Sequence, residues 1–127
     1  MNMNKYSDSL DKYIKNRNVI SISRERIDKN KVYSIPLKKS QDCLLLAQLD
    51  DFLFDGFMII KIEDITELSQ EMFISKILKK EKIQLTNEPT IPENMGNWQE
   101  IFNWLISLKI IVIIECECLD YNGAIDL

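Results

Sequence analysis

A dense group of carboxylates between positions 50 and 67 is the part of this sequence best equipped for chemistry. Its members are Asp50, Asp51, Asp55, Glu63, Asp64 and Glu67. A magnesium-dependent nuclease uses such groups together with a lysine, and Asp55, Glu63 and Lys61 invite that comparison. However, Lys61 and Glu63, which would share one face of a strand, stand in the reverse of the common Glu-x-Lys order. The pattern therefore favours solvated carboxylates at loop and strand ends over a catalytic site.

The remaining composition removes most other catalytic, metal and cofactor sites. The chain has no histidine, the commonest general base and zinc ligand, and its three glycines cannot form a P-loop or a dinucleotide fingerprint. Cys43, Cys116 and Cys118 lack the C-x-x-C spacing of zinc sites, and we expect them to be reduced thiols. The sequence therefore predicts no catalytic residue, no metal ligand, no cofactor and a protein that is not an enzyme.

Aromatic residues interleave with the carboxylates and suggest recognition instead. Phe52, Phe54 and Phe57 flank the acidic positions, and such a surface can dock a basic protein, because charge raises the association rate and aromatic anchors supply affinity. The predicted contact set is the six carboxylates with Phe52 and Phe54. Small acidic proteins that neutralise cationic toxin nucleases work in this way. An immunity-type inhibitor that binds a basic toxin domain is therefore our first hypothesis.

A β-hairpin is expected to present this group. The apolar runs Cys43–Leu49 and Phe57–Ile62 flank a loop whose single glycine is Gly56, which predicts an antiparallel hairpin with a connection longer than the tightest type. Cys43–Leu49 is apolar almost throughout, so it should be covered on both faces. Before it come the strand candidates Val19–Ser23 and Val32–Leu37. Pro36 lacks an N–H, which indicates a sheet edge or a bulge.

Helices are expected before and after this sheet portion in the chain. The sheet portion spans residues 18–68. Within residues 1–17, Tyr6, Leu10, Tyr13 and Ile14 form one helical stripe that Ser7 or Asp8 could cap. The alternative for this segment is a basic arm. Residues 69–109 should hold two helices separated by the loop Thr86–Asn97.

The two later helices differ in their apolar faces. The first is expected from the N-cap Ser69 to about Lys82, with a stripe that consists of Phe73, Ile74, Ile77 and Leu78. The second should begin at Asn97, with Glu100 completing a capping box, and end near Lys109. Its apolar residues cover more than half its circumference, which predicts either burial on several sides or a face for a partner.

The segment 110–127 is expected to form a final strand and a short hairpin. Ile110–Ile114 continues into Cys118 with the alternation of a strand, and Asn122-Gly123 is typical of a two-residue turn. Residues 1–127 together predict one α+β domain. Its core is a bent antiparallel sheet, with two to three helices.

Several of these segments carry a resemblance to a known family. Leu44-Leu-Leu, Asp51-Phe, Asp55-Gly-Phe and Lys61-Ile-Glu-Asp-Ile-Thr-Glu-Leu68 resemble an uncharacterised bacterial family with an Sm-like small β-barrel domain. The similarity extends more loosely to Trp98 and to the strand Ile111–Cys118. It implies an α+β fold whose bent sheet is of the Sm-like or SH3-like kind and, as an alternative function, RNA binding. Members of the family continue with further strands, whereas this chain ends at Leu127.

The distribution of charge bears on these alternatives. The net charge is −4, yet residues 1–40 carry ten Lys and Arg against four acids, and residues 41–127 carry six against sixteen. The basic part could contact phosphates, but the acidic remainder should repel RNA, which favours a basic protein as partner.

A structural or oligomeric scaffold built through the helix 98–108 is the third alternative. With no secretory signal and no apolar run long enough to span a membrane, a cytoplasmic location is expected.

Overall fold

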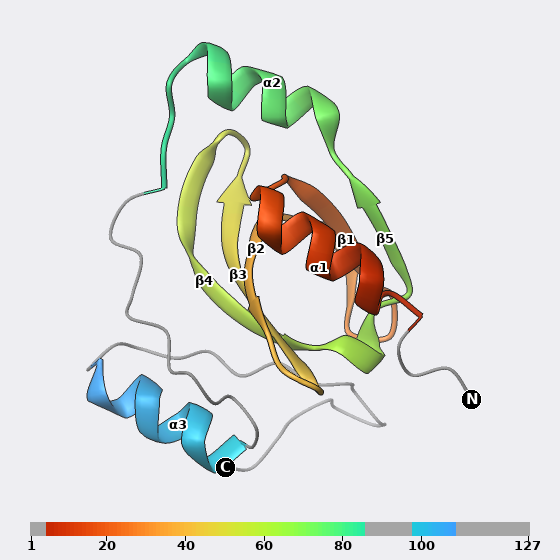
Figure 1. Ribbon diagram of the computed structural model, residues 1–127, viewed down its shortest axis with the longest axis vertical. Helices are drawn as coiled ribbons and strands as arrows, with labels where there is room; N and C mark the ends of the chain where they lie inside the picture. Colours follow the sequence, from red (N-terminus) through yellow and green to blue (C-terminus); the bar gives the residue numbers. More distant parts are fainter. Residues whose placement is uncertain (1–4, 86–97, 109–127) are drawn as a thin grey trace.

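The computed structural model describes residues 5–85 and 98–108 (Figure 1). The elements in chain order are α1 (Ser7–Asn16), β1 (Ile20–Arg24), β2 (Asp28–Lys39), β3 (Cys43–Asp50), β4 (Leu53–Lys61), the 3₁₀ helix η1 (Ile62–Asp64), β5 (Glu67–Gln70), α2 (Met72–Lys80) and α3 (Trp98–Ser107). The five strands form one antiparallel sheet in the order β4-β3-β2-β1-β5. The predicted α+β class is therefore confirmed.

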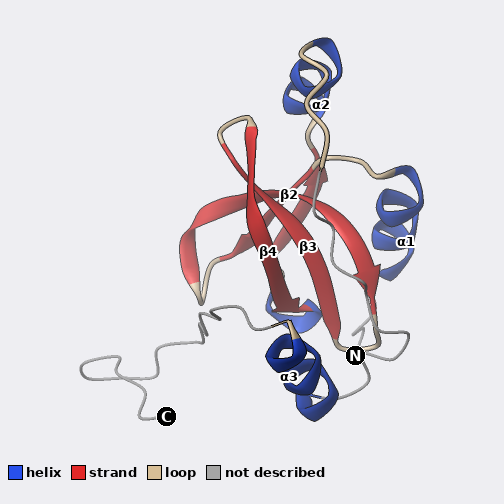
Figure 2. Cartoon of the chain, turned by 90° about the vertical axis from the view of Figure 1, so that its left-hand side faces the viewer, coloured by secondary structure: helices blue, strands red, loops and turns tan. Residues whose placement is uncertain are grey.

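The sheet is strongly bent but open. Figure 2 shows β2 arching over the molecule. β4 and β5 are the edges of the described sheet, which does not close into a barrel. Part of the bend follows from Pro36, where the pairing of β2 with β3 shifts register between Pro36 and Lys38. The bulge predicted for this proline is confirmed. The predicted edge position also holds locally, because among the described residues β2 pairs with β1 only up to Ser34, which leaves Pro36 paired on the β3 side alone.

The hairpin between β3 and β4 differs from the prediction. Its connection is the two residues Asp51 and Phe52, since Asp50 already pairs with Leu53. Asp51 has φ +59°, a left-handed conformation that aspartate tolerates. Gly56 is not in the turn: it lies within β4, with φ +83°, where the pairing with β3 shifts register. The expected longer connection is wrong, because Gly56 lies in the bulge of β4 and Asp51 provides the positive φ of the turn.

Both faces of the sheet are covered, and β3 contributes to both. Leu44 and Leu46 pack with α1 through Leu10, in a cluster that includes residues of β1 and β4. Cys43 and Leu45, on the opposite face, pack with Ile101 of α3. Successive strand residues point to opposite faces, so a strand between two layers must be apolar throughout. The prediction that Cys43–Leu49 is covered on both sides is confirmed.

The helix termini correct three predicted caps. α1 begins after Tyr6 with no side-chain cap, so neither Ser7 nor Asp8 serves as one. Ser69 belongs to β5, where its hydroxyl hydrogen-bonds that of Ser21 at 2.9 Å, and the sheet therefore extends to Gln70. Glu71 caps α2 instead. The predicted cap Asn97, the loop before it and the strand and hairpin expected in 110–127 lie outside the described residues.

No helix in the described ranges is long and apolar enough to cross a membrane.

Candidate functional site

The six predicted carboxylates lie at two ends of β4. Asp50, Asp51 and Asp55 surround the β3–β4 hairpin turn, whereas the other three follow the far end of the strand, on η1 and at the start of β5 (Figure 1). β4 has nine residues, which separates the groups by up to about 30 Å at the usual rise of a strand. The structure therefore does not bring the six together as one surface.

The far group is partly balanced by the protein's own cations. Lys61 Nζ lies 2.9 Å from Glu63 Oε1, and Arg26 in the β1–β2 turn lies 3.4 Å from Asp64 Oδ1. The hydrogen bond and charge of Lys61 lower the pKa of the Glu63 carboxyl, and Glu63 in turn raises the pKa of Lys61. These contacts reduce what Glu63 and Asp64 can offer to a partner. Glu67 is exposed at the start of β5.

Asp55, Lys61 and Glu63, which were compared with a magnesium-dependent nuclease site, do not form such a site in the structure. Lys61 and Glu63 do not share a strand face, since β4 ends at Lys61 and Glu63 lies in η1. Asp55 stands at the other end of β4. Among residues 5–85 and 98–108, no group of three or more Cys, Asp or Glu side chains is placed to hold a metal ion.

Near the hairpin turn, exposed apolar side chains come from two elements, and one aromatic pair joins these elements. The ring centroids of Phe52, in the hairpin turn, and Phe73, in the first turn of α2, are 6.3 Å apart with an interplanar angle of 64°, an edge-to-face pair. We call the exposed apolar side chains of these two elements the tip patch. It consists of Phe52 (38% exposed), Leu53 (66%), Met72 (55%) and Phe73 (63%).

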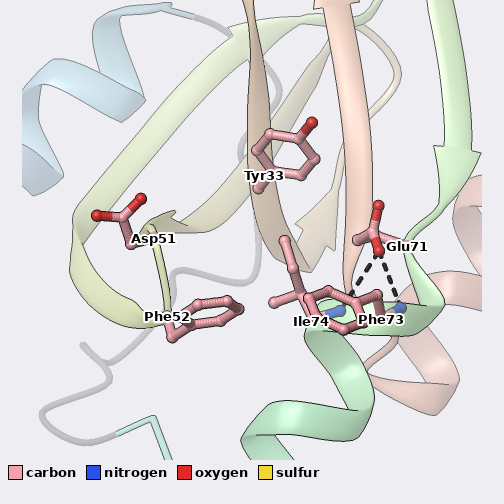
Figure 3. A pocket seen from close by; sticks show the side chains of 6 residues that line it. All are labelled: Tyr33, Asp51, Phe52, Glu71, Phe73 and Ile74. Carbon is pink, nitrogen blue, oxygen red and sulfur yellow. Dashed lines mark hydrogen bonds between the residues drawn. The ribbon is translucent and has the colours of Figure 1, made fainter.

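A hollow of about 300 Å³ lies beside this aromatic pair. It is lined by Tyr33, Asp51, Phe52, Glu71, Phe73 and Ile74. Figure 3 shows Phe52 and Phe73 converging near Ile74, with Tyr33 on the sheet above them. Two of the lining residues are acidic and none is basic. The hollow thus combines aromatic walls with carboxylates.

The local sequence explains why the patch forms. Glu71 Oε1 accepts hydrogen bonds from the backbone N–H groups of Phe73 (2.9 Å) and Ile74 (3.3 Å), which fixes the first turn of α2. The Glu71 N–H donates to the Val19 carbonyl at 2.8 Å, so α2 starts directly from the sheet. Ile74 then packs with Val19 and Leu78. With Ile74 turned inward, its neighbour Phe73 on the helix is left outside.

The predicted aromatic anchors have different outcomes. Phe52 is exposed in the tip patch, whereas Phe54 is half-buried and packs against Leu78 and Val19 under α2. Phe57 is exposed farther along β4, opposite Ala47.

Met72 and Phe73 were missed as site residues, because Phe73 was assigned to the buried stripe of the helix. One signal could have found them. Met72, Phe73 and Ile74 are consecutive, and a helix cannot turn three consecutive side chains toward the same core.

Cys43 is a free and buried thiol on the α3 side of the sheet. Burial, followed by the charge of Asp42, raises its pKa, which makes the thiol a poor nucleophile. Cys116 and Cys118 lie outside the described residues.

A scan against protein-family models, a search of curated proteins and a search of solved structures each found no match for this chain.

Proposed function

We propose that this protein is a non-enzymatic binding module that docks a basic protein partner through the tip patch and the carboxylates beside it. The sharpest form of the proposal is an immunity-type inhibitor that neutralises a cationic bacterial toxin domain in the cytoplasm. The observation that carries it is the exposed Phe52–Phe73 pair next to Asp50, Asp51 and Asp55.

The aromatic pair supplies the affinity in this proposal. Aromatic side chains are enriched among the few residues that dominate binding energy, and they act best at the centre of an interface with polar residues around them. The Phe52 and Phe73 rings contact each other edge to face, and a contact that is already formed before binding lowers the entropy lost on binding.

The carboxylates supply partner selection. Asp50, Asp51 and Asp55 are exposed, and within the described residues none of the three forms an ion pair. Their charge is therefore available to accelerate the approach of a cationic partner and to disfavour an anionic one. We accordingly narrow the proposed contact set to these three with the tip patch, and we leave Glu63, Asp64, Glu67 and Phe54 out of it.

The test uses charge-matched variants of the full chain. D50N/D55N removes two carboxylates at the tip, and E63Q/E67Q removes two at the far end of β4. Each tagged protein is used to capture partners from the native cell, with nuclease treatment to remove RNA bridges, and the captured protein is then purified and titrated. We expect a basic protein whose association rate falls about tenfold with D50N/D55N and is nearly unchanged with E63Q/E67Q.

A second pair of variants tests the aromatic anchors. F52A/F73A should weaken the same complex by about 2 kcal/mol or more, whereas F102A/I106A, which removes exposed apolar side chains of α3, should not. Equal losses from both pairs would contradict the proposed site. A captured partner that is acidic, or material that disappears with nuclease treatment, would contradict the proposed class of partner.

A further inference from the structure

A second hollow, of about 400 Å³, is lined by residues of α2, of the hairpin strand β4 and of the chain around them. Its apolar lining comes from the residue before β1, from β2, β4 and α2, and from the chain after α2: Val19, Ile35, Phe54, Leu78, Ile83 and Leu85. Val19 and Leu78 are buried, and the other side chains are half-exposed. An apolar floor of this size is typical of a site for a small ligand.

The rim of this hollow is cationic. Arg17, Lys79 and Lys82 line it, and no carboxylate does. Arg17 ends α1 with φ +51°, and Lys82 follows α2 with φ +56°, so the ends of two helices place basic residues at one opening. The C-terminal end of α2 is capped by the Ile83 N–H, which donates to the Leu78 carbonyl at 2.9 Å. The backbone thus holds these positions in place even though their side chains are exposed.

The two hollows are opposite in charge although they share α2 and the hairpin. The one beside Phe52 contains Asp51 and Glu71 and no cation, whereas this one contains three cations and no acid. A basic surface that suits the first would be repelled by the second. The second hollow therefore requires a different ligand, one that joins an apolar body to a negative charge.

We propose that the cationic hollow binds a small anionic amphiphile, a monocarboxylate with an alkyl body. The alkyl part lies on the floor formed by Phe54, Leu78 and Ile83, and the carboxylate faces the Lys79 and Lys82 ammonium groups. Apolar burial supplies most of the affinity, and the cations select the sign of the head group. The proposal does not depend on the docking function of the tip patch.

The test titrates the full chain with dodecanoate below its critical micelle concentration, followed by calorimetry and by backbone amide NMR shifts. The matched ligand is dodecyltrimethylammonium, with the same chain and the opposite charge. The variant K79Q/K82N removes two rim cations, and asparagine tolerates the left-handed conformation at position 82. The control K76Q/K80Q removes two exposed cations from the same helix that do not line the hollow.

We expect saturable binding of dodecanoate, with amide shifts confined to residues 17, 19, 35, 75–85 and the adjoining part of β4. K79Q/K82N should weaken it three- to tenfold, roughly the effect of two exposed ion pairs, and K76Q/K80Q should leave it unchanged. S75F, which places a large side chain into the hollow, should abolish binding.

Four outcomes would overturn the proposal. They are no saturable binding of dodecanoate, equal binding of the cationic ligand, equal weakening by the two lysine pairs, and binding only to vesicles that contain anionic phospholipid. The last result would indicate a membrane surface rather than a pocket ligand. None of them bears on the tip patch, because the partner assays use other residues.

Discussion

Single residues with unusual backbone conformations shape the candidate site. Asp51 and Gly56 both have positive φ, one in the hairpin turn and one in the bulge of β4. The first allows the tight turn that exposes Phe52, and the second accommodates the register shift between β3 and β4. Aspartate and asparagine adopt this backbone region readily, whereas alanine does not, so the effect of a substitution depends on which residue is introduced.

We predict that G56A lowers the free energy of unfolding by about 1–2 kcal/mol through backbone strain. An added Cβ meets nothing within 4 Å, so the cost is conformational rather than steric. D51N, which keeps a residue suited to positive φ, should change stability little. Urea denaturation of both variants checks this, and an unchanged midpoint for G56A would contradict it.

The Lys61–Glu63 pair gives a residue-level prediction about pH. Lys61 lowers the pKa of Glu63, so the contribution of this pair to stability is present above the unfolded pKa of glutamate and is lost as the pH falls through the folded pKa. K61Q should raise the pKa of Glu63 toward its ordinary value. Carbon-detected NMR titration of the Glu63 carboxyl measures this shift directly, and E67Q provides a control that leaves the pair intact.

At the scale of elements, α2 is the part whose placement decides the site. It follows β5 with only Glu71 between them, and the Glu71 carboxylate satisfies two N–H groups of its first turn. Because Phe73 lies in that turn, loss of the Glu71 cap would also disturb the position of the Phe73 ring against Phe52.

We therefore predict that E71A destabilises the protein by about 1 kcal/mol and also weakens partner binding at the tip. E71Q keeps an acceptor oxygen and should have a smaller effect on both. E81A, at the other end of α2, serves as the control, since an acidic residue there makes no such cap. Thermal unfolding and titration of the partner are the two measurements, and loss of stability with full binding would argue against the link.

The elements also show how far the sequence predicts this molecule. The nearly continuous apolar content of Cys43–Leu49 predicted a strand covered on both sides, and the missing N–H of Pro36 predicted a sheet edge or a bulge. Predictions from local sequence patterns failed where one residue suits two different secondary structures. Ser69 suits a helix cap as well as a strand, and only its pairing with Ser21 decides between them.

The candidate site was less predictable than the fold. Carboxylates close in sequence looked like one cluster, but a strand of nine residues carries them apart. The contact of Phe52 with Phe73 joins positions 21 residues apart and depends on the register of several strands. The sequence alone contains no short-range signal for such a contact.

At the scale of the whole molecule, α1 closes one face of the bent sheet. Leu10 is fully buried among Ile20, Leu44 and Ile60, and Lys39 ties the helix to β2 through contacts with Asp11 (3.0 Å) and Ser7 (2.8 Å). Residues 7–16 thus form a helix that packs on the core through Leu10.

We predict that L10A lowers the free energy of unfolding by about 2–5 kcal/mol, because it leaves a cavity between α1 and the sheet. L53A, at an exposed position of the tip patch, should cost little stability but weaken the partner complex. Chemical denaturation compares the two. A small effect of L10A would mean that α1 can detach from the sheet without loss of the fold.

The short edge strand β5 has a consequence for regulation. Within residues 5–85 and 98–108 its four residues pair with β1 alone, yet they fix where α2 begins. Separation of this strand from β1 would release the start of α2 and withdraw Leu68 from the cluster that contains Leu44 and Leu46. Recognition would then be lost through local opening, without global unfolding. Amide exchange at positions 67–70 should accordingly report how often the protein is competent to bind.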